Sequence, residues 1–190
     1  MSSQPRRVKI WYQSFVDPDQ QSAYCKTLAE ALNGMAGKDV RFDVHGIVPP
    51  DLELHRLTEF RCARQVIRHA VEAQRQGYGA FAIGHFQDGG LYEARSTVDI
   101  PVLGLGEAAM LYGCTLGQKI GLVTINSVFI PMHEEQIQRY GLSRRVVAVK
   151  AIETDPATAV ALNRFNGTAA SRLATFQKPS AKALREFLDT

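Results

Sequence analysis

Strand-length apolar runs alternate with helical patterns from residue 8 to about residue 152, and this alternation constrains the fold more than any other feature. It is typical of α/β proteins, in which crossover helices join parallel strands. Strands are predicted over residues 8–15, 40–47, 79–85, 100–106, 119–125 and 145–152, with helices between them. No further strand is predicted beyond about Asp155. The second half of the chain is therefore expected to be incomplete or altered after that point.

Two of the predicted helices carry specific local signals. Asp17 is placed to cap the helix after the first strand, with Pro18 in its first turn. The longest helix, over residues 57–76, has a stripe of apolar residues that faces a core: Ala63, Val66, Ile67, Ala70 and Val71. Glu59 and Arg61 of that helix could bind substrate, but a solvated face is the favoured interpretation.

Composition and charge exclude several classes of protein. The 22 Lys and Arg are scattered and the net charge is only +3, which argues against a nucleic-acid partner. No uncharged apolar run has membrane-spanning length, and residues 1–15 lack a signal-peptide core, so we expect a cytoplasmic protein without a membrane partner. The cysteines are odd in number and far apart, which predicts reduced thiols in helices: Cys25, Cys62 and Cys114.

Ligands of open parallel sheets bind beyond the carboxyl ends of the strands. His85 follows an apolar run there, and an imidazole with an ordinary pKa of about 6.5 can act as a general base. The alternative is that His85 only bonds a neighbouring loop. Other polar residues lie at or just after the ends of predicted strands, His45 among them, and seven of these could orient a small-molecule substrate: Gln13, Ser14, Gln87, Asp88, Glu107, Thr124 and Asn126.

Simpler interpretations remain open for several of these positions. The loop 87–90 could bind a carboxylate or carbonyl oxygen through its N–H groups, or be a plain turn. Glu107 fits the first turn of a helix through the helix dipole, and Thr124 and Asn126 could cap the next helix. The segment 104–109 lacks the third glycine of a dinucleotide fingerprint, which weakens nucleotide binding.

The histidines do not predict a metal site. His45, His55 and His85 match no metal-binding spacing and have no acidic cluster with them, so no metal is expected. His69 and His133 fall within helical patterns and are predicted to lie at the surface or at the edge of a core.

Residues 90–110 read G-L-x-x-A-R-x-x-V-D-I-P-V-x-G-x-G-E-A-A-M, and this segment resembles the hydantoin and allantoin racemases of the aspartate/glutamate racemase superfamily. The resemblance extends more loosely over residues 8–152. It implies two similar α/β lobes, with parallel sheets flanked by helices and the active site between them. We place the lobes at residues 1–112 and 113–190. It also implies a homo-oligomer that inverts a carbon next to a carbonyl without a cofactor.

The sequence departs from the family's two-cysteine pattern. The family writes C-F-x-D-P-G-L around its first catalytic cysteine, whereas this chain has His85 at that position. The segment of the second cysteine is not present, and Cys114 falls inside the predicted helix 107–117. We therefore predict proton transfer by His85 on a small hydantoin-like or amino-acid-like substrate. The alternative is a member of the family that binds a small carboxylate and is either catalytically inactive or uses one base, as a lyase or decarboxylase.

Overall fold

A computed structural model describes residues 7–50, 56–124 and 127–151. The chain divides into two compact units, Met1–Ala109 and Met110–Thr190. This division and the lobe boundary placed after residue 112 both fall within helix α4 (Leu105–Leu116). Each unit is described by itself. The region after about Asp155, where an altered second lobe was predicted, lies outside the described residues.

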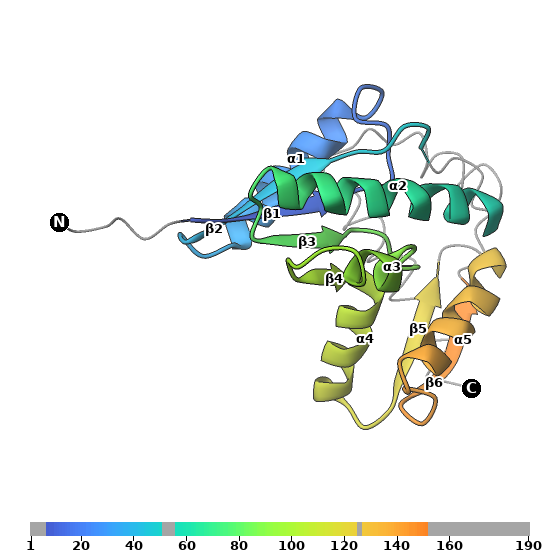
Figure 1. The fold of residues 1–190 in the computed structure, drawn as a ribbon. Coiled ribbons are helices and arrows are strands. Elements are labelled where there is room, and N and C mark those ends of the chain that lie inside the picture. The colour runs from blue at the N-terminus through green and yellow to red at the C-terminus, as the bar shows by residue number, and fades with distance from the viewer. Residues whose placement is uncertain (1–6, 51–55, 125–126, 152–190) are drawn as a thin grey trace. The chain divides into compact units, whose positions relative to one another are not determined.

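The first unit contains a four-stranded parallel sheet (Figure 1). Its strands are β1 (Val8–Gln13), β2 (Val40–His45), β3 (Ala80–Ile83) and β4 (Val102–Gly104), in the order β2-β1-β3-β4. Every neighbouring pair is parallel. The predicted α/β class with parallel strands is confirmed.

Helices α1 (Ser22–Met35), α2 (Arg56–Arg75) and α3 (Leu91–Arg95) complete this unit, together with the start of α4. Figure 1 shows α2 running along the sheet. The side chains between them form the core, which contains Trp11, Phe15, Ile47, Cys62, Val66, Ala70, Ala73, Tyr78, Phe81, Ile83, Leu91, Ala94 and Val102. No disulfide joins the three cysteines, which lie in α1, α2 and α4 as predicted.

The start of α1 differs from the prediction. Asp17 Oδ1 accepts the backbone N–H groups of Asp19 and Gln20, at 2.9 and 3.2 Å, in a turn that precedes the helix. The helix itself begins at Ser22 without a side-chain cap. Asp17 satisfies nearby N–H groups as a capping residue does, but it does so one turn too early to cap α1.

The second unit has a parallel pair of strands, β5 (Ile120–Thr124) and β6 (Val146–Ala151). A short 3₁₀ helix η1 (Ser127–Phe129) leads into α5 (Ile130–Arg139). The residues of β5 alternate between exposed and more buried positions. That period of two is typical of a strand with one solvated face.

Arg145 fixes the end of α4 within the second unit. Its guanidinium donates to the carbonyls of Cys114, Gly117 and Gln118, which are among the last acceptors of that helix and its exit. Helix carboxyl ends leave carbonyls without internal partners, and an arginine is well suited to satisfy several of them. No helix in the described ranges is long and apolar enough to cross a membrane.

Candidate active site

The carboxyl ends of the four strands lie at one edge of the sheet. Gln13, the last residue of β1, is in register with His45 of β2 and with Ile83 of β3. Ile83 is in turn paired with Gly104, the last residue of β4. The segments that follow these strands therefore start side by side, where the sequence placed a ligand site.

His85 is held between an aromatic ring and a carboxylate. Its ring stacks on Phe15, with ring centroids 4.3 Å apart and planes 9° from parallel. Its Nε2 lies 2.7 Å from Oε1 of Glu59. The His85 side chain is 19% exposed. The ring is thus fixed in direction and still partly accessible, and its Nε2 faces a carboxylate on α2.

Glu59 lies beside His85, although sequence reasoning favoured a solvated position for it over a role in substrate binding. The favoured solvated face is wrong for this residue, because Glu59 is only 7% exposed. The buried positions of α2 include 59, 62, 66, 70 and 73, and these spacings of three and four are those of one helix face. Extending the apolar stripe back by one turn would have reached Glu59. Arg61 is exposed, as predicted, and donates to the Pro50 carbonyl.

The contact with Glu59 determines what His85 can do. A carboxylate only accepts hydrogen bonds, so Oε1 receives the Nε2–H of the imidazole. In the neutral ring the lone pair then lies on Nδ1, which becomes the nitrogen that takes a proton. Glu59 would stabilise the resulting imidazolium, as the acidic member of a catalytic triad does.

Gln13 is a buried residue that connects the segments around the candidate site. Its side chain is fully buried, and Oε1 accepts from Trp11 Nε1 at 3.0 Å and from His69 Nδ1 at 2.7 Å. Its Nε2 faces the carbonyls of the residues that end or follow β1 and β2: Ser14, His45 and Gly46. The Nε2 of Gln13 thus holds the strand ends together, and its Oε1 joins β1 to α2. Ser14 is also buried, and His69 lies at the core edge as predicted.

Asp88 and Glu107 meet at the start of α4. The Asp88 carboxylate accepts the N–H of Gly106 at 2.9 Å and of Glu107 at 2.6 Å, so it caps this helix. Gly104 makes room for it, because a Cβ there would lie 2.6 Å from Cγ of Asp88. The Glu107 carboxylate lies in the first turn of α4 and pairs with the Arg95 guanidinium.

The loop 87–90 uses some of its N–H groups internally. The Asp88 N–H donates to the His85 carbonyl, and the Leu91 N–H donates to the Asp88 carbonyl. The turn interpretation holds for the Asp88 N–H of the loop and for the Leu91 N–H that follows it. Gln87 is half-buried in the same loop.

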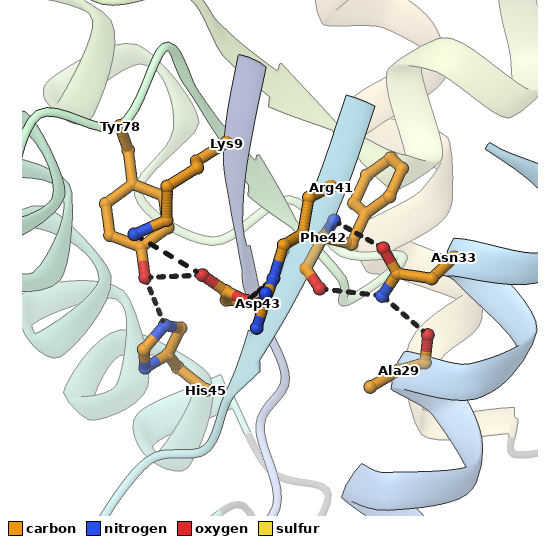
Figure 2. A network of polar contacts seen from close by, with 8 residues as sticks. All are labelled: Lys9, Ala29, Asn33, Arg41, Phe42, Asp43, His45 and Tyr78. Carbon is orange, nitrogen blue, oxygen red and sulfur yellow. Dashed lines mark hydrogen bonds and ion pairs between the residues drawn. The ribbon is translucent and has the colours of Figure 1, made fainter. Parts of the chain in front are cut away.

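His45 belongs to a polar network on β1 and β2 rather than to the surroundings of His85 (Figure 2). Its Nε2 lies 3.3 Å from the Tyr78 hydroxyl, which donates to Asp43 at 3.0 Å. Burial and the adjacent Asp43 raise the pKa of Tyr78 to about 12. Lys9 and Arg41 flank Asp43, at 3.7 and 2.9 Å.

The pKa values in this network follow from burial and charge. Burial raises the pKa of Asp43, but hydrogen bonds from Arg41 and Tyr78 and the nearby cations outweigh it, so the net shift is downward. Burial lowers the pKa of His45, against a smaller opposing effect of Asp43. The His45 ring also stacks on Trp11, with centroids 3.4 Å apart. Within the described ranges no three His, Cys, Asp or Glu residues form a potential metal cluster.

A second polar cluster lies within the other unit. His133 is 3% exposed, so the prediction of a surface or core-edge position is wrong. Its Nδ1 lies 2.8 Å from Oε1 of Gln136, and its Nε2 lies 3.3 Å from the Thr124 hydroxyl at the end of β5. Thr124 is buried and does not cap α5, whose N-cap is Phe129. Asn126 lies outside the described residues.

Comparison with known proteins decides the family. A family model described as Asp/Glu/hydantoin racemase matches residues 16–185. The chain belongs to this family. The match covers most of the sequence and confirms the resemblance of residues 90–110. It identifies the chain as a member of a racemase family.

Individual relatives agree with this assignment. The hydantoin racemase of Pseudomonas sp. (strain NS671) is 24% identical over 161 residues, which cover 80% of this chain and 64% of the relative. The hydantoin racemase of Rhizobium meliloti is 30% identical over 82 residues, 43% of this chain and 34% of that protein. The chain thus spans less than two thirds of either relative's length.

Solved structures show the same fold. The allantoin racemase from Klebsiella pneumoniae matches with a TM-score of 0.75 and 24% identity, over 94% of this chain and 70% of that one. The allantoin racemase from Pseudomonas fluorescens matches with a TM-score of 0.67 and 17% identity, over 91% and 73%. The racemase-like α/β fold predicted from the sequence is confirmed.

Proposed function

We propose that this protein catalyses cofactor-independent proton transfer at the carbon next to a carbonyl of a small hydantoin-like or amino-acid-like substrate. His85 is the acid/base. One observation carries this proposal: an imidazole at the carboxyl end of an inner strand is stacked on Phe15 and hydrogen-bonded by the buried Glu59. The racemase family of the chain supports the same reaction class.

The chemistry follows from the tautomer that Glu59 selects. Nδ1 of His85 removes the α-proton, and the electron pair of the C–H bond moves towards the carbonyl to form an enolate. The Glu59 carboxylate stabilises the imidazolium formed in this step, at a distance of 2.7 Å. When the proton on His85 is replaced by one from solvent before it is returned to the same face, the substrate gains a solvent hydrogen. A donor on the opposite face would give inversion.

The other predicted residues take different parts in this proposal. Gln13 and Asp88 shape the site through their bonds to the protein, as positioning residues. Ser14, Gln87 and Glu107 are proposed to orient the substrate, with Arg95 balancing the charge of Glu107. Thr124 and Asn126 are proposed to bind substrate as well.

Deuterium wash-in tests the role of His85 without requiring a second base. The protein is incubated in D₂O near neutral pH with hydantoins, allantoin and amino acids, and loss of the α-proton signal is followed by NMR. We expect wild-type exchange above the buffer rate, and a fall of about 10²- to 10⁴-fold in His85→Ala, the usual contribution of a general base.

Two variants of α2 make a matched pair for the same assay. Glu59→Gln should slow exchange because a neutral amide stabilises the imidazolium less than a carboxylate does. Glu72→Gln is the control, since Glu72 lies on the same helix and its carboxylate accepts a hydrogen bond from the exposed Gln76. Equal exchange in wild type and His85→Ala, or no exchange with any candidate, would contradict the proposal.

A further inference from the structure

We propose that Glu59 also binds the substrate, by accepting a hydrogen bond from a substrate N–H at its second carboxylate oxygen, Oε2. This inference rests on the proposed function. It starts from a difference in hydrogen bonding between the two carboxylate oxygens of Glu59. Oε1 of Glu59 is paired with His85 at 2.7 Å, whereas Oε2 is buried and has no hydrogen-bond partner among the described residues.

A buried acceptor without a donor is costly. The Glu59 side chain is 8% exposed, so little water can compensate it from the surface. Removing a polar group from water without a new hydrogen bond is unfavourable, and a charged group makes this worse. Most buried polar atoms in native proteins do have partners, so an exception next to a candidate base points to a ligand.

The glycine loop that follows His85 packs against the backbone of α2 near Glu59. A Cβ on Gly90 would lie 2.9 Å from the Ala63 carbonyl, and a Cβ on Gly89 would lie 3.5 Å from Cβ of Ala63 and 3.7 Å from the Glu59 carbonyl. The loop that follows His85 therefore lies directly on the turn of α2 that carries Glu59. Because Gly90 also has φ +83, a side chain there would be strained as well as crowded.

The donor that fits Oε2 has a defined chemistry. An ionised carboxylate accepts hydrogen bonds and donates none, so it favours an amide N–H or an ammonium group and repels a substrate carboxylate. Oε1 and Oε2 belong to one group, so the bound N–H must lie close to the ring that removes the proton. The substrate is thus expected to present an N–H near its acidic carbon, with any anionic group directed away from Glu59.

N-methylation of the ligand tests this directly and needs no mutation. Binding of a 5-substituted hydantoin to the wild-type protein is compared with binding of its N1-methyl and N3-methyl derivatives, and an amino acid is compared with its N,N,N-trimethyl form, which has no N–H. We expect a loss of affinity of about ten- to a hundredfold for the methylated position that Oε2 contacts, the usual value of a hydrogen bond to a charged group. The two series distinguish a ring N–H from an ammonium group.

The Glu59→Gln variant assigns the effect to this residue. It should shrink the preference for N–H over N-methyl to about threefold or less, while Glu72→Gln keeps the wild-type ratio. Far-ultraviolet circular dichroism and Trp11 fluorescence check that each variant is folded. An unchanged ratio in folded Glu59→Gln, or no preference in the wild type, would overturn the assignment.

The outcomes separate this inference from the proposed function. His85→Ala should lose exchange and retain the N–H preference, because the two roles use different atoms. Wild-type exchange without any N–H preference overturns the role of Oε2 alone. An N–H preference that depends on Glu59 in a protein that exchanges no substrate supports this role of Oε2 and overturns the catalytic one.

Discussion

The cap of α4 by Asp88 allows a quantitative test of how the site is built. Asp88 is 4% exposed, its two oxygens accept two backbone N–H groups at 2.9 and 2.6 Å, and its φ is +52. Two separate effects therefore contribute at one position. The carboxylate satisfies the first N–H groups of the helix, and the backbone adopts a left-handed conformation that most residues avoid.

Substitutions of Asp88 separate these effects. Losing an N-cap costs about 1 kcal/mol, and losing the second charge-assisted bond in a buried site brings the total to about 2 kcal/mol. Asp88→Gly removes the carboxylate but suits a positive φ, so about 2 kcal/mol is expected. Asp88→Ala adds left-handed strain of about 1 kcal/mol, for a total of about 3 kcal/mol. Asp88→Asn keeps one acceptor and should cost about 1 kcal/mol.

Urea unfolding followed by Trp11 fluorescence measures these differences. Trp11 is the single tryptophan of the chain and is 5% exposed in the core of the first unit. The midpoint should move while the slope m stays constant, because the folded unit keeps its compactness. If Asp88→Ala is no less stable than Asp88→Gly, the backbone argument is refuted. A loss below about 0.5 kcal/mol in both would refute the cap.

Three further predictions concern other contacts. Gly104→Ala should destabilise the first unit by about 1–3 kcal/mol in the same assay, because its Cβ would overlap the Asp88 carboxylate, and less so in an Asp88→Gly background. Arg145→Met should lower hydrogen-exchange protection of the last turn of α4 by about 1–3 kcal/mol, since three carbonyls lose their donor. Burial lowers the pKa of His45, so the unfolded chain binds more protons below about pH 6.5. Unfolding free energy should therefore fall as the pH drops from about 6.5 towards the folded pKa, and His45→Gln should flatten that slope.

The strands and helices were predictable because their signals are local and periodic. The long pattern of α2 matched the helical period, and the short length of the apolar run of β3 favoured a strand. A topological rule predicted the edge of the sheet at which a ligand would bind. The registers of Gln13 with His45 and with Ile83 show that the strand ends meet at that edge, and ligand binding there stays a prediction.

Burial of polar side chains was harder to predict. Glu59 and His133 both lie on the inner face of a helix, and both were assigned by their polarity to solvent or to the edge of a core. Helical spacing alone would have placed Glu59 with Cys62 and Val66. A charged residue on an apolar stripe contradicts the binary pattern, and such contradictions occur mainly at functional sites.

The rule that ligands bind beyond the carboxyl ends of parallel strands has a second limit. It does not distinguish residues that stabilise the site from residues that contact the ligand. Gln13 and Asp88 were both predicted to bind substrate, yet each already makes several bonds to the protein through both of its polar side-chain atoms. Glu59 is different, because one of its oxygens is engaged by His85 and the other has no partner among the described residues. The number of hydrogen bonds that a side chain already makes is therefore the better criterion. A side chain whose polar atoms are all bonded within the protein stabilises the fold. A buried carboxylate beside a base that has one oxygen without a partner can still accept a hydrogen bond from a substrate.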